Sequence, residues 1–224
     1  MRKIVIVPAG GKGSRSGFSK PKQFIKVKGK ELIIYSLETF QKSRLIDEII
    51  ISADKSFYPL LEKLKQKYRL SKIKQIVEGG KERQDSVYNA LSSASAEPDD
   101  LIIVHDAARP LLPAGVLTEA IKIAEQKGNS VVCVRGSNTL IRGRNYVYEY
   151  ISRENVLYVQ TPQIFRYRDL MKAMKKAYRE NFYGTDESML VKRIGRKVNI
   201  TEGSNFNFKI TTKEDFKLFE SLVR

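Results

Sequence analysis

Short apolar runs, rich in β-branched residues, alternate with amphipathic segments along most of this 224-residue chain. The runs have the length and composition of buried strands, and they are Lys3–Val7, Ile46–Ser52, Ile73–Glu78, Leu101–His105, Val131–Arg135 and Lys197–Ile200. The segments between them have a helical period, and they are Leu32–Gln41, Phe57–Tyr68, Asp85–Ser93 and Pro113–Gln126. Strands that are apolar throughout need cover on both faces. The alternation therefore predicts an α/β fold with a mostly parallel sheet and helices on both of its faces.

Residues 1–224 are expected to form one domain, because neither a linker nor an internal repeat interrupts the pattern. Near the end of the chain, Phe206–Ile210 is predicted to be a strand and Thr212–Val223 a helix. Another helix is expected to start at a cap formed by Thr185 or Asp186. The chain shows neither a signal-peptide pattern nor the roughly 18 apolar residues of a membrane span. With one cysteine, Cys133, in an apolar run, a cytoplasmic protein with a buried thiol is expected.

A β-hairpin is predicted over Asn138–Ser152, where two strand-like runs flank a turn that contains Gly143. Its second run alternates aromatic residues, and no helix nearby in the sequence would cover them. Two interpretations are open from the residues alone: an edge hairpin folded on its own domain, or an arm over about residues 137–155 that packs on a second subunit.

The segment Pro8–Lys22, the opening loop, follows the first strand and has glycines close together at positions 10, 11 and 13. Bare backbone there lets N–H groups approach phosphate oxygens, and Arg15 and Lys22 add two cations. The dinucleotide fingerprint fails because Ser16 stands where its third glycine belongs, and no glycine has the spacing of the Walker loop. The segment therefore predicts a triphosphate site of another kind, with a solvated surface turn as the alternative.

Polar residues follow several predicted strands, and the carboxyl ends of parallel strands share one edge of a sheet. We therefore expect four segments to converge at this edge: the opening loop (Pro8–Lys22), Gly79–Ser86, His105–Pro110 and Ser137–Thr139. Asp106 is expected to have open space around it for sugar hydroxyls, with a helix cap or a salt bridge to Arg109 as alternatives. Arg109 offers a planar fork for a phosphate or polyol. His105 is expected to fill the core, and Ser86 has a helix N-cap as its simplest role.

The formal net charge of +16 raises a second class of function, a nucleic-acid-binding protein. The basic residues are scattered along the chain, and no zinc, RNP or basic-zipper motif accompanies them. We therefore expect neither a nucleic-acid partner nor a membrane partner. The charge is expected instead to solvate the surface and to attract small anions.

Motifs along the whole chain, in matching order, resemble the 2-C-methyl-D-erythritol 4-phosphate cytidylyltransferase family of the non-mevalonate isoprenoid pathway. The first motif is shared more widely, with nucleotidyltransferases that activate sugars and polyols. The residues that carry the resemblance are Ala9–Arg15, Pro21–Gln23, Gly79–Val87, His105–Pro110, Thr161–Gln163 and Asn207–Thr211. It implies a Rossmann-like nucleotidyltransferase fold with a protruding β-arm that crosses a homodimer.

The resemblance also implies roles for individual residues. Arg15 and Lys22 match the pair that stabilises the transition state. Residues on the segments that hold CTP are Ala9, Gly10, Gly11, Gly80, Ser86 and Ala107. Residues on the methylerythritol phosphate side are Asp106, Arg109, Thr139 and Thr161, with Arg153 and Lys209 positioning its phosphate. The family often has aspartate before the arm threonine, where this chain has Asn138.

The expected reaction is attack of a substrate phosphate oxygen on the α-phosphorus of CTP, with loss of pyrophosphate. The nucleophile is already an anion, so the site needs cations and alignment rather than a base. Mg²⁺ is expected on the triphosphate, and no residue is assigned as its ligand. Three alternatives remain at this stage: a ribitol-5-phosphate cytidylyltransferase, the nucleic-acid-binding protein, and a nucleotide sensor without turnover.

Overall fold

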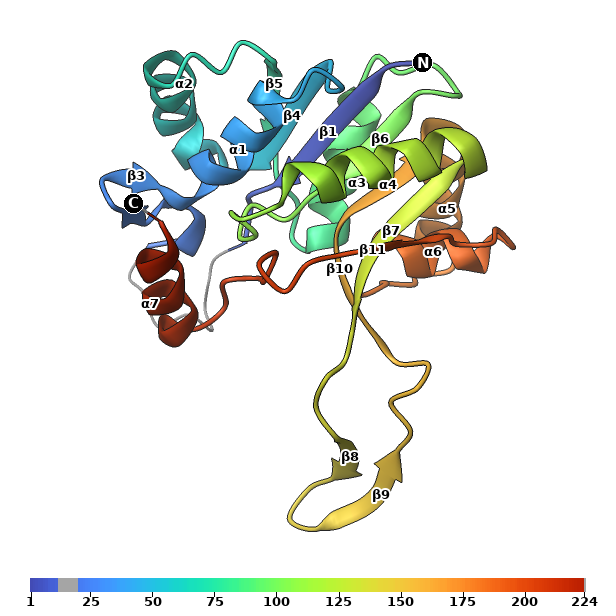
Figure 1. Cartoon of the computed structure of the whole chain (residues 1–224). Helices are drawn as coiled ribbons and strands as arrows, with labels where there is room; N and C mark the ends of the chain where they lie inside the picture. Colours follow the sequence, from blue (N-terminus) through green and yellow to red (C-terminus); the bar gives the residue numbers. More distant parts are fainter. Residues whose placement is uncertain (12–19, 224) are drawn as a thin grey trace.

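A seven-stranded sheet forms the centre of the computed structural model, which describes residues 1–11 and 20–223 (Figure 1). Its strand order is β11-β7-β10-β6-β1-β4-β5. The strands are β1 (Lys3–Pro8), β4 (Glu48–Ala53), β5 (Ile73–Glu78), β6 (Leu101–Val104), β7 (Asn129–Arg135), β10 (Leu157–Arg166) and β11 (Ile200–Glu202). Pairing is parallel at every step except on the two sides of β10, which runs antiparallel to β6 and to β7. The prediction of a mostly parallel sheet is confirmed.

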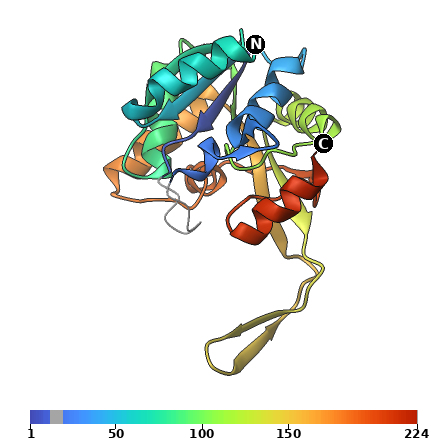
Figure 2. The ribbon, with the colours of Figure 1, turned by 90° about the vertical axis from the view of Figure 1, so that its left-hand side faces the viewer.

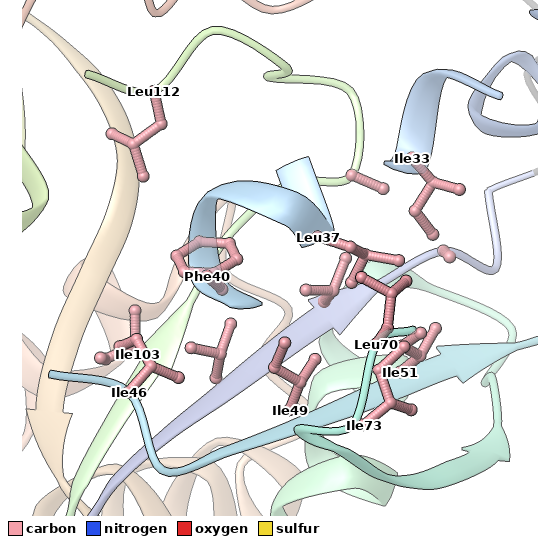
Figure 3. Packing of buried hydrophobic residues seen from close by; sticks show 14 of the residues in the cluster. Ile33, Leu37, Phe40, Ile46, Ile49, Ile51, Leu70, Ile73, Ile103 and Leu112 are labelled. Atoms are coloured by element: carbon pink, nitrogen blue, oxygen red, sulfur yellow. The ribbon is translucent and has the colours of Figure 1, made fainter. Parts of the chain in front are cut away.

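Alternate residues of β1 enter two separate apolar clusters, because successive side chains of a strand point to opposite faces. Val5 and Val7 pack with α1 (Leu32–Lys42), α2 (Tyr58–Lys67) and α4 (Ala114–Lys127). Figure 3 shows another part of this cluster, where Leu37 and Phe40 of α1 lie over residues of the sheet. Ile4 and Ile6 pack on the opposite face with helices α3 (Arg83–Ser93), α5 (Tyr167–Arg179) and α6 (Glu187–Arg193). Helices therefore cover both faces, as the apolar strands predict.

The last helix, α7 (Lys213–Leu222), lies outside these two layers and belongs to a third, smaller cluster. The ring of Phe219 packs edge to face against the ring of Tyr35 in α1, with the two ring centroids 4.9 Å apart. Phe219 also packs with Ile210. The short strands β2 (Lys26–Val27) and β3 (Lys30–Glu31) pair with each other beside it. The C-terminal segment is thereby held against the start of α1, close to the end of the opening loop.

The predicted strand Phe206–Ile210 is wrong, because this segment forms turns and irregular backbone. It makes hydrogen bonds to several different elements instead of one continuous ladder. The amide of Ile210 donates to the carbonyl of Ala108 at 2.8 Å, and the fully buried Asn207 donates to the carbonyl of Thr161 at 2.7 Å. The neighbouring strand prediction, Lys197–Ile200, is displaced toward the C-terminus, where β11 occupies residues 200–202.

Other local predictions are confirmed. Gly128 ends α4 in the left-handed region, with φ of +83° and its amide bonded to the carbonyl of Ala124. Asp186 caps α6 and accepts from the amide of Met189.

Cys133 is buried, as predicted, and burial raises the pKa of its thiol to about 11. Within the described part of the chain, no helix has the length and apolar character needed to cross a membrane.

The predicted hairpin consists of β8 (Leu140–Gly143) and β9 (Val147–Ile151), which pair antiparallel with each other. Figures 1 and 2 show it standing away from the rest of the molecule in both views. Tyr146 and Tyr150 are each 73% exposed on it. The interpretation in which the hairpin folds on its own domain is therefore wrong, and the hairpin is an arm.

Candidate active site

The opening loop and the loop after β5 meet at the carboxyl edge of the sheet, as expected. The amide of Ala9 donates to the carbonyl of Ser52 at 2.7 Å, and that of Gly79 donates to the carbonyl of Ala53 at 2.8 Å. A Cβ atom placed on Gly10 would lie 3.2 Å from Ser86 Oγ. Strands β1, β4 and β5 run parallel, so their ends bring these two glycine-rich segments side by side.

Ser86 holds the second of these segments, and its predicted role as an N-cap is wrong. It lies within α3, whose N-cap is Glu82 in a capping box with Asp85. The Oγ atom accepts from the amide of Gly80 at 3.0 Å and donates to the carbonyl of Glu82 at 3.2 Å. A Cβ atom on Gly80 would lie 2.9 Å from the backbone carbon of Asp85, so only glycine fits there.

Gln23, directly after Lys22, holds the start of the opening loop, and this role was not among the sequence predictions. Its buried amide donates to the carbonyl of Ala9 at 2.5 Å and to that of Gly11 at 3.0 Å. Next to it, Lys22 donates from Nζ to the carbonyl of Ile210 at 2.7 Å. Arg15, the other predicted catalytic cation, lies outside the described residues, so its distance from Lys22 stays a prediction.

Asp106 follows β6 and is surrounded by cations, so the expected open space around it is absent among the described residues. Its Oδ1 accepts from Arg83 Nε at 3.0 Å and its Oδ2 from Lys209 Nζ at 2.8 Å. Arg109 Nε lies 3.8 Å from Oδ2, so the alternative of a salt bridge to Arg109 is also present. Burial alone would raise the pKa of Asp106, but the charges of Arg83, Lys209 and Arg109 outweigh it and hold the pKa far below its ordinary value. The carboxylate is therefore ionised at any physiological pH.

Arg83 and Glu187 complete this cluster, and neither was among the predicted site residues. Glu187 is 1% exposed and accepts from both terminal nitrogens of Arg83, at 2.7 and 3.1 Å. Burial lowers the pKa of Arg83, and the two carboxylates raise it further than burial lowers it. Arg83 lies in a motif that carries the resemblance, so that motif was the available signal. Glu187 follows the predicted cap Asp186, but a cap says nothing about a partner 104 residues away.

Thr161 reaches the cluster because β10 is irregular at this point. The register between β10 and β7 shifts between Val159 and Gln163, and Thr161 lies within the shift. Its Oγ1 accepts from the amide of Asp106 at 3.1 Å and lies 3.1 Å from His105 Nδ1. It therefore holds the backbone of Asp106.

His105 is fully buried, as expected, and burial lowers its pKa to about 4. Its Nε2 lies 3.0 Å from the carbonyl of Arg109. That carbonyl can only accept, so Nε2 carries the proton and Nδ1 accepts from the threonine hydroxyl. The neutral ring supports the turn from residue 105 to residue 109, and Ala107 is buried inside this turn. This is the core role that the sequence predicts.

Thr139 and Arg153 lie at the base of the arm and are exposed. Arg153 donates to the carbonyl of Ser137 at 2.6 Å, which joins the two sides of the arm. No contact found among residues 1–11 and 20–223 joins either residue to Asp106. The expected convergence of Ser137–Thr139 with the other loops is therefore wrong within one chain, because β7 leads straight into the arm.

The cluster has the composition of an anion site. Three cations, Arg83, Arg109 and Lys209, face two carboxylates, so an excess positive charge remains. A hollow of about 360 Å³ lies next to it, lined by residues 81–84 and by Tyr183 and Gly184. A larger groove of about 770 Å³ between α3 and α5 contains none of the predicted site residues. Within the described ranges, no group of three or more His, Cys, Asp and Glu side chains is arranged to hold a metal ion.

Comparison with known proteins agrees with the motifs. The sequence model of the family described as 2-C-methyl-D-erythritol 4-phosphate cytidylyltransferase matches residues 3–224. Enzymes of that name from Bacillus cereus and Clostridioides difficile are 38% and 39% identical to the chain over 221 residues each. These matches cover 98% of the chain, and 97% and 92% of the respective relatives. The crystal structure of the Francisella tularensis enzyme is similar with a TM-score of 0.84 at 30% identity, over the full length of both chains.

Proposed function

The chain belongs to the 2-C-methyl-D-erythritol 4-phosphate cytidylyltransferase family, and from this membership we propose a function for each part of its site. The reaction is transfer of a cytidylyl group from CTP to 2-C-methyl-D-erythritol 4-phosphate in isoprenoid biosynthesis. A phosphate oxygen of the polyol forms a new bond to the α-phosphorus of CTP. The bond from that phosphorus to the diphosphate breaks, and pyrophosphate leaves with the electron pair.

CTP is proposed to bind across the two glycine-rich segments. Their contact through Gly10, Gly80 and Ser86 supports this, because the backbone there is bare and the segments come from neighbouring strands. Ala9, Gly11 and Ala107 lie on the same edge of the sheet. Lys22 is proposed to neutralise charge that develops on the phosphates in the transition state, and Arg15 is proposed as its companion.

The polyol phosphate is proposed to bind at the cluster around Asp106. The observation that carries this proposal is one ionised carboxylate shared by three cations at the edge of the CTP loops. Such a carboxylate has lone pairs left to accept from hydroxyl groups of a polyol. Lys209 and Arg109 supply positive charge for its phosphate. Thr161 supports this side of the site through the backbone of Asp106.

Mg²⁺ is proposed to enter as part of the nucleotide substrate. The described residues do not form a carboxylate cage for it, and both oxygens of Asp106 already accept from cations. Mg²⁺ commonly keeps several waters and binds through substrate phosphates, where it neutralises their charge. The residues of the chain then align the reactants and supply the remaining positive charge.

The arm is proposed to form a homodimer and to carry Thr139 and Arg153 to the site of the second copy. Support comes from the exposed tyrosines of the arm and from the exposed positions of these two residues. Exposed aromatic residues in a group are typical of interaction surfaces. A cytoplasmic location is proposed as well, and a buried free thiol agrees with a reducing compartment.

The test is a pyrophosphate-release assay with purified protein, CTP, Mg²⁺ and the methylerythritol phosphate. We expect turnover that stops when EDTA removes Mg²⁺ and that falls by about a hundredfold or more in Asp106→Asn. Ribitol 5-phosphate serves as the matched substrate control and is expected to react far more slowly. Equal use of both polyols would contradict the proposed substrate, and full activity of Asp106→Asn would contradict the proposed site.

A further inference from the structure

Arg83 is held between two carboxylates that have different surroundings. Its Nε donates to Asp106, and its two terminal nitrogens form a bidentate fork on Glu187. Asp106 lies beside Lys209 and Arg109 at the proposed polyol site. Glu187 is buried behind the guanidinium. Arg83 therefore links the buried carboxylate of Glu187 to the carboxylate of Asp106 at the proposed polyol site.

The fold fixes the position of Glu187 before any substrate binds. It is the first residue of α6, and the cap Asp186 accepts from the amide of Met189 at 2.9 Å. Gln163 of β10 accepts from the amide of Ser188 at 2.9 Å and donates to Asp186 at 3.1 Å. The start of α6 is thereby fastened to a central strand of the sheet. A negative charge in a first helical turn is also favoured by the helix dipole.

We propose that Glu187 is a positioning residue for the polyol phosphate: through Arg83 it sets where the carboxylate of Asp106 stands and how strongly Lys209 holds it. This inference rests on the function proposed for the Asp106 cluster. Glu187 itself does not touch the substrate in this scheme. Its contribution is the fixed anchor that a buried, planar guanidinium needs in order to point its Nε in one direction.

The charges explain why the anchor matters. A buried guanidinium needs carboxylate partners, and loss of one partner leaves it to interact more strongly with the other. In Glu187→Gln the amide keeps one acceptor oxygen, but its NH₂ group faces a donor of Arg83. Arg83 is then expected to move toward Asp106 and to compete with Lys209 for it. The polyol side of the site is disturbed, whereas the contact between Gly80 and Ser86 is not.

The experiment measures both Michaelis constants and the turnover number for Glu187→Gln. We expect the KM for methylerythritol phosphate to rise about tenfold or more, with the KM for CTP within about twofold of wild type. A merely structural role would reduce the amount of active enzyme and so lower kcat, but it would leave both KM values unchanged. The matched control is Glu180→Gln. Glu180 forms an exposed ion pair with Arg193 of α6, in which a terminal nitrogen of Arg193 lies 2.6 Å from Glu180 Oε2. This variant is expected to change neither KM.

A double-mutant cycle tests the route through Arg83. Arg83→Lys keeps the charge and removes the fork, so adding Glu187→Gln to it is expected to raise the polyol KM by less than about twofold further. Independent, multiplicative effects would overturn the proposal, as would an unchanged polyol KM in Glu187→Gln. If that variant does not fold, Glu187→Asp, which withdraws the carboxylate by one methylene, is measured under the same criterion. An inactive wild-type protein would instead count against the proposed function.

Discussion

Lys22 donates from its Nζ to the carbonyl oxygen of Ile210 at 2.7 Å, which ties the end of the opening loop to the residue after Lys209. Lys209 in turn pairs with Asp106 at 2.8 Å. The proposed CTP side and the proposed polyol side are therefore joined through one short C-terminal segment. Two lysines that are 187 positions apart in the sequence are thus proposed to serve one reaction centre.

Lys22→Ala is expected to lower turnover by about a hundredfold or more while changing the KM for CTP by less than about threefold. The reason is that its proposed contribution develops only as the phosphates gain charge in the transition state. Steady-state kinetics with both substrates measure this, and Lys26→Ala serves as the control because the Lys26 side chain is 62% exposed. A loss of CTP affinity equal to the loss of turnover would contradict the role.

Gly11→Ala is expected to weaken CTP binding, whereas Gly80→Ala is expected to destabilise the fold. Among the described residues, no atom lies within 4 Å of a Cβ built on Gly11, so this variant should keep its melting temperature and lose affinity for CTP. In Gly80→Ala the new methyl group meets the backbone of Asp85, which should cost about 1–3 kcal/mol of stability. Thermal unfolding and CTP titration separate the two. Unchanged CTP affinity in Gly11→Ala would mean that the loop does not approach the nucleotide.

Mixing two inactive variants tests whether the arm serves the other subunit. If Arg153 acts across a dimer, a heterodimer of Arg153→Ala and Lys22→Ala has one site with both residues intact. Random reassortment should then restore about a quarter of the wild-type activity. Each variant alone and a mixture kept below the dimerisation concentration are the controls. Activity that stays at the level of the separate variants would leave Arg153 acting within its own chain.

His105 should make the folded protein sensitive to acid well above the range of ordinary carboxylates. Its pKa is about 4 in the folded chain against 6.5 for the free side chain, so the unfolded state binds the proton more readily. The stability due to the neutral ring is complete above about pH 6.5 and is lost as the pH falls toward 4, by about 3 kcal/mol in total. Urea unfolding at a series of pH values measures this loss. Asp106, with its low pKa, adds to it only below about pH 4.

The chain has a single histidine, so NMR gives a direct second readout. The one imidazole signal of the folded protein should not titrate between about pH 8 and pH 5. A midpoint near the ordinary value of histidine would show that the ring is accessible to protons. It would also remove the predicted loss of stability.

The layered fold was predictable because its information is local. Strands β1, β4, β6 and β7 are largely apolar runs, and the helices between them repeat apolar residues at helical spacing. β10 was missed, because Gln160, Thr161 and Pro162 break its apolar character in the middle. Helix α5 was missed too, although Leu170, Met174 and Ala177 have helical spacing and are buried on one face. That helix could have been found from its period.

The site was predictable only to the level of loops. Strand ends placed the glycine-rich segments and Asp106 on one edge, which the structure bears out. Which side chains pair there depends on contacts between distant segments, as between Arg83 and Glu187. The residues around Arg83 and around Glu187 in the sequence do not indicate that these two side chains form an ion pair. The position of the arm likewise follows from tertiary structure, because the hairpin pattern is the same for an arm and for an edge strand.

The register shift between Val159 and Gln163 divides β10 into two halves that differ in their strand partners. The half before it continues into the arm, and the half after it pairs with both β6 and β7 in the body of the sheet. An arm from a relative, grafted between Arg135 and Leu157, should therefore leave the ladder between β7 and β10 in place.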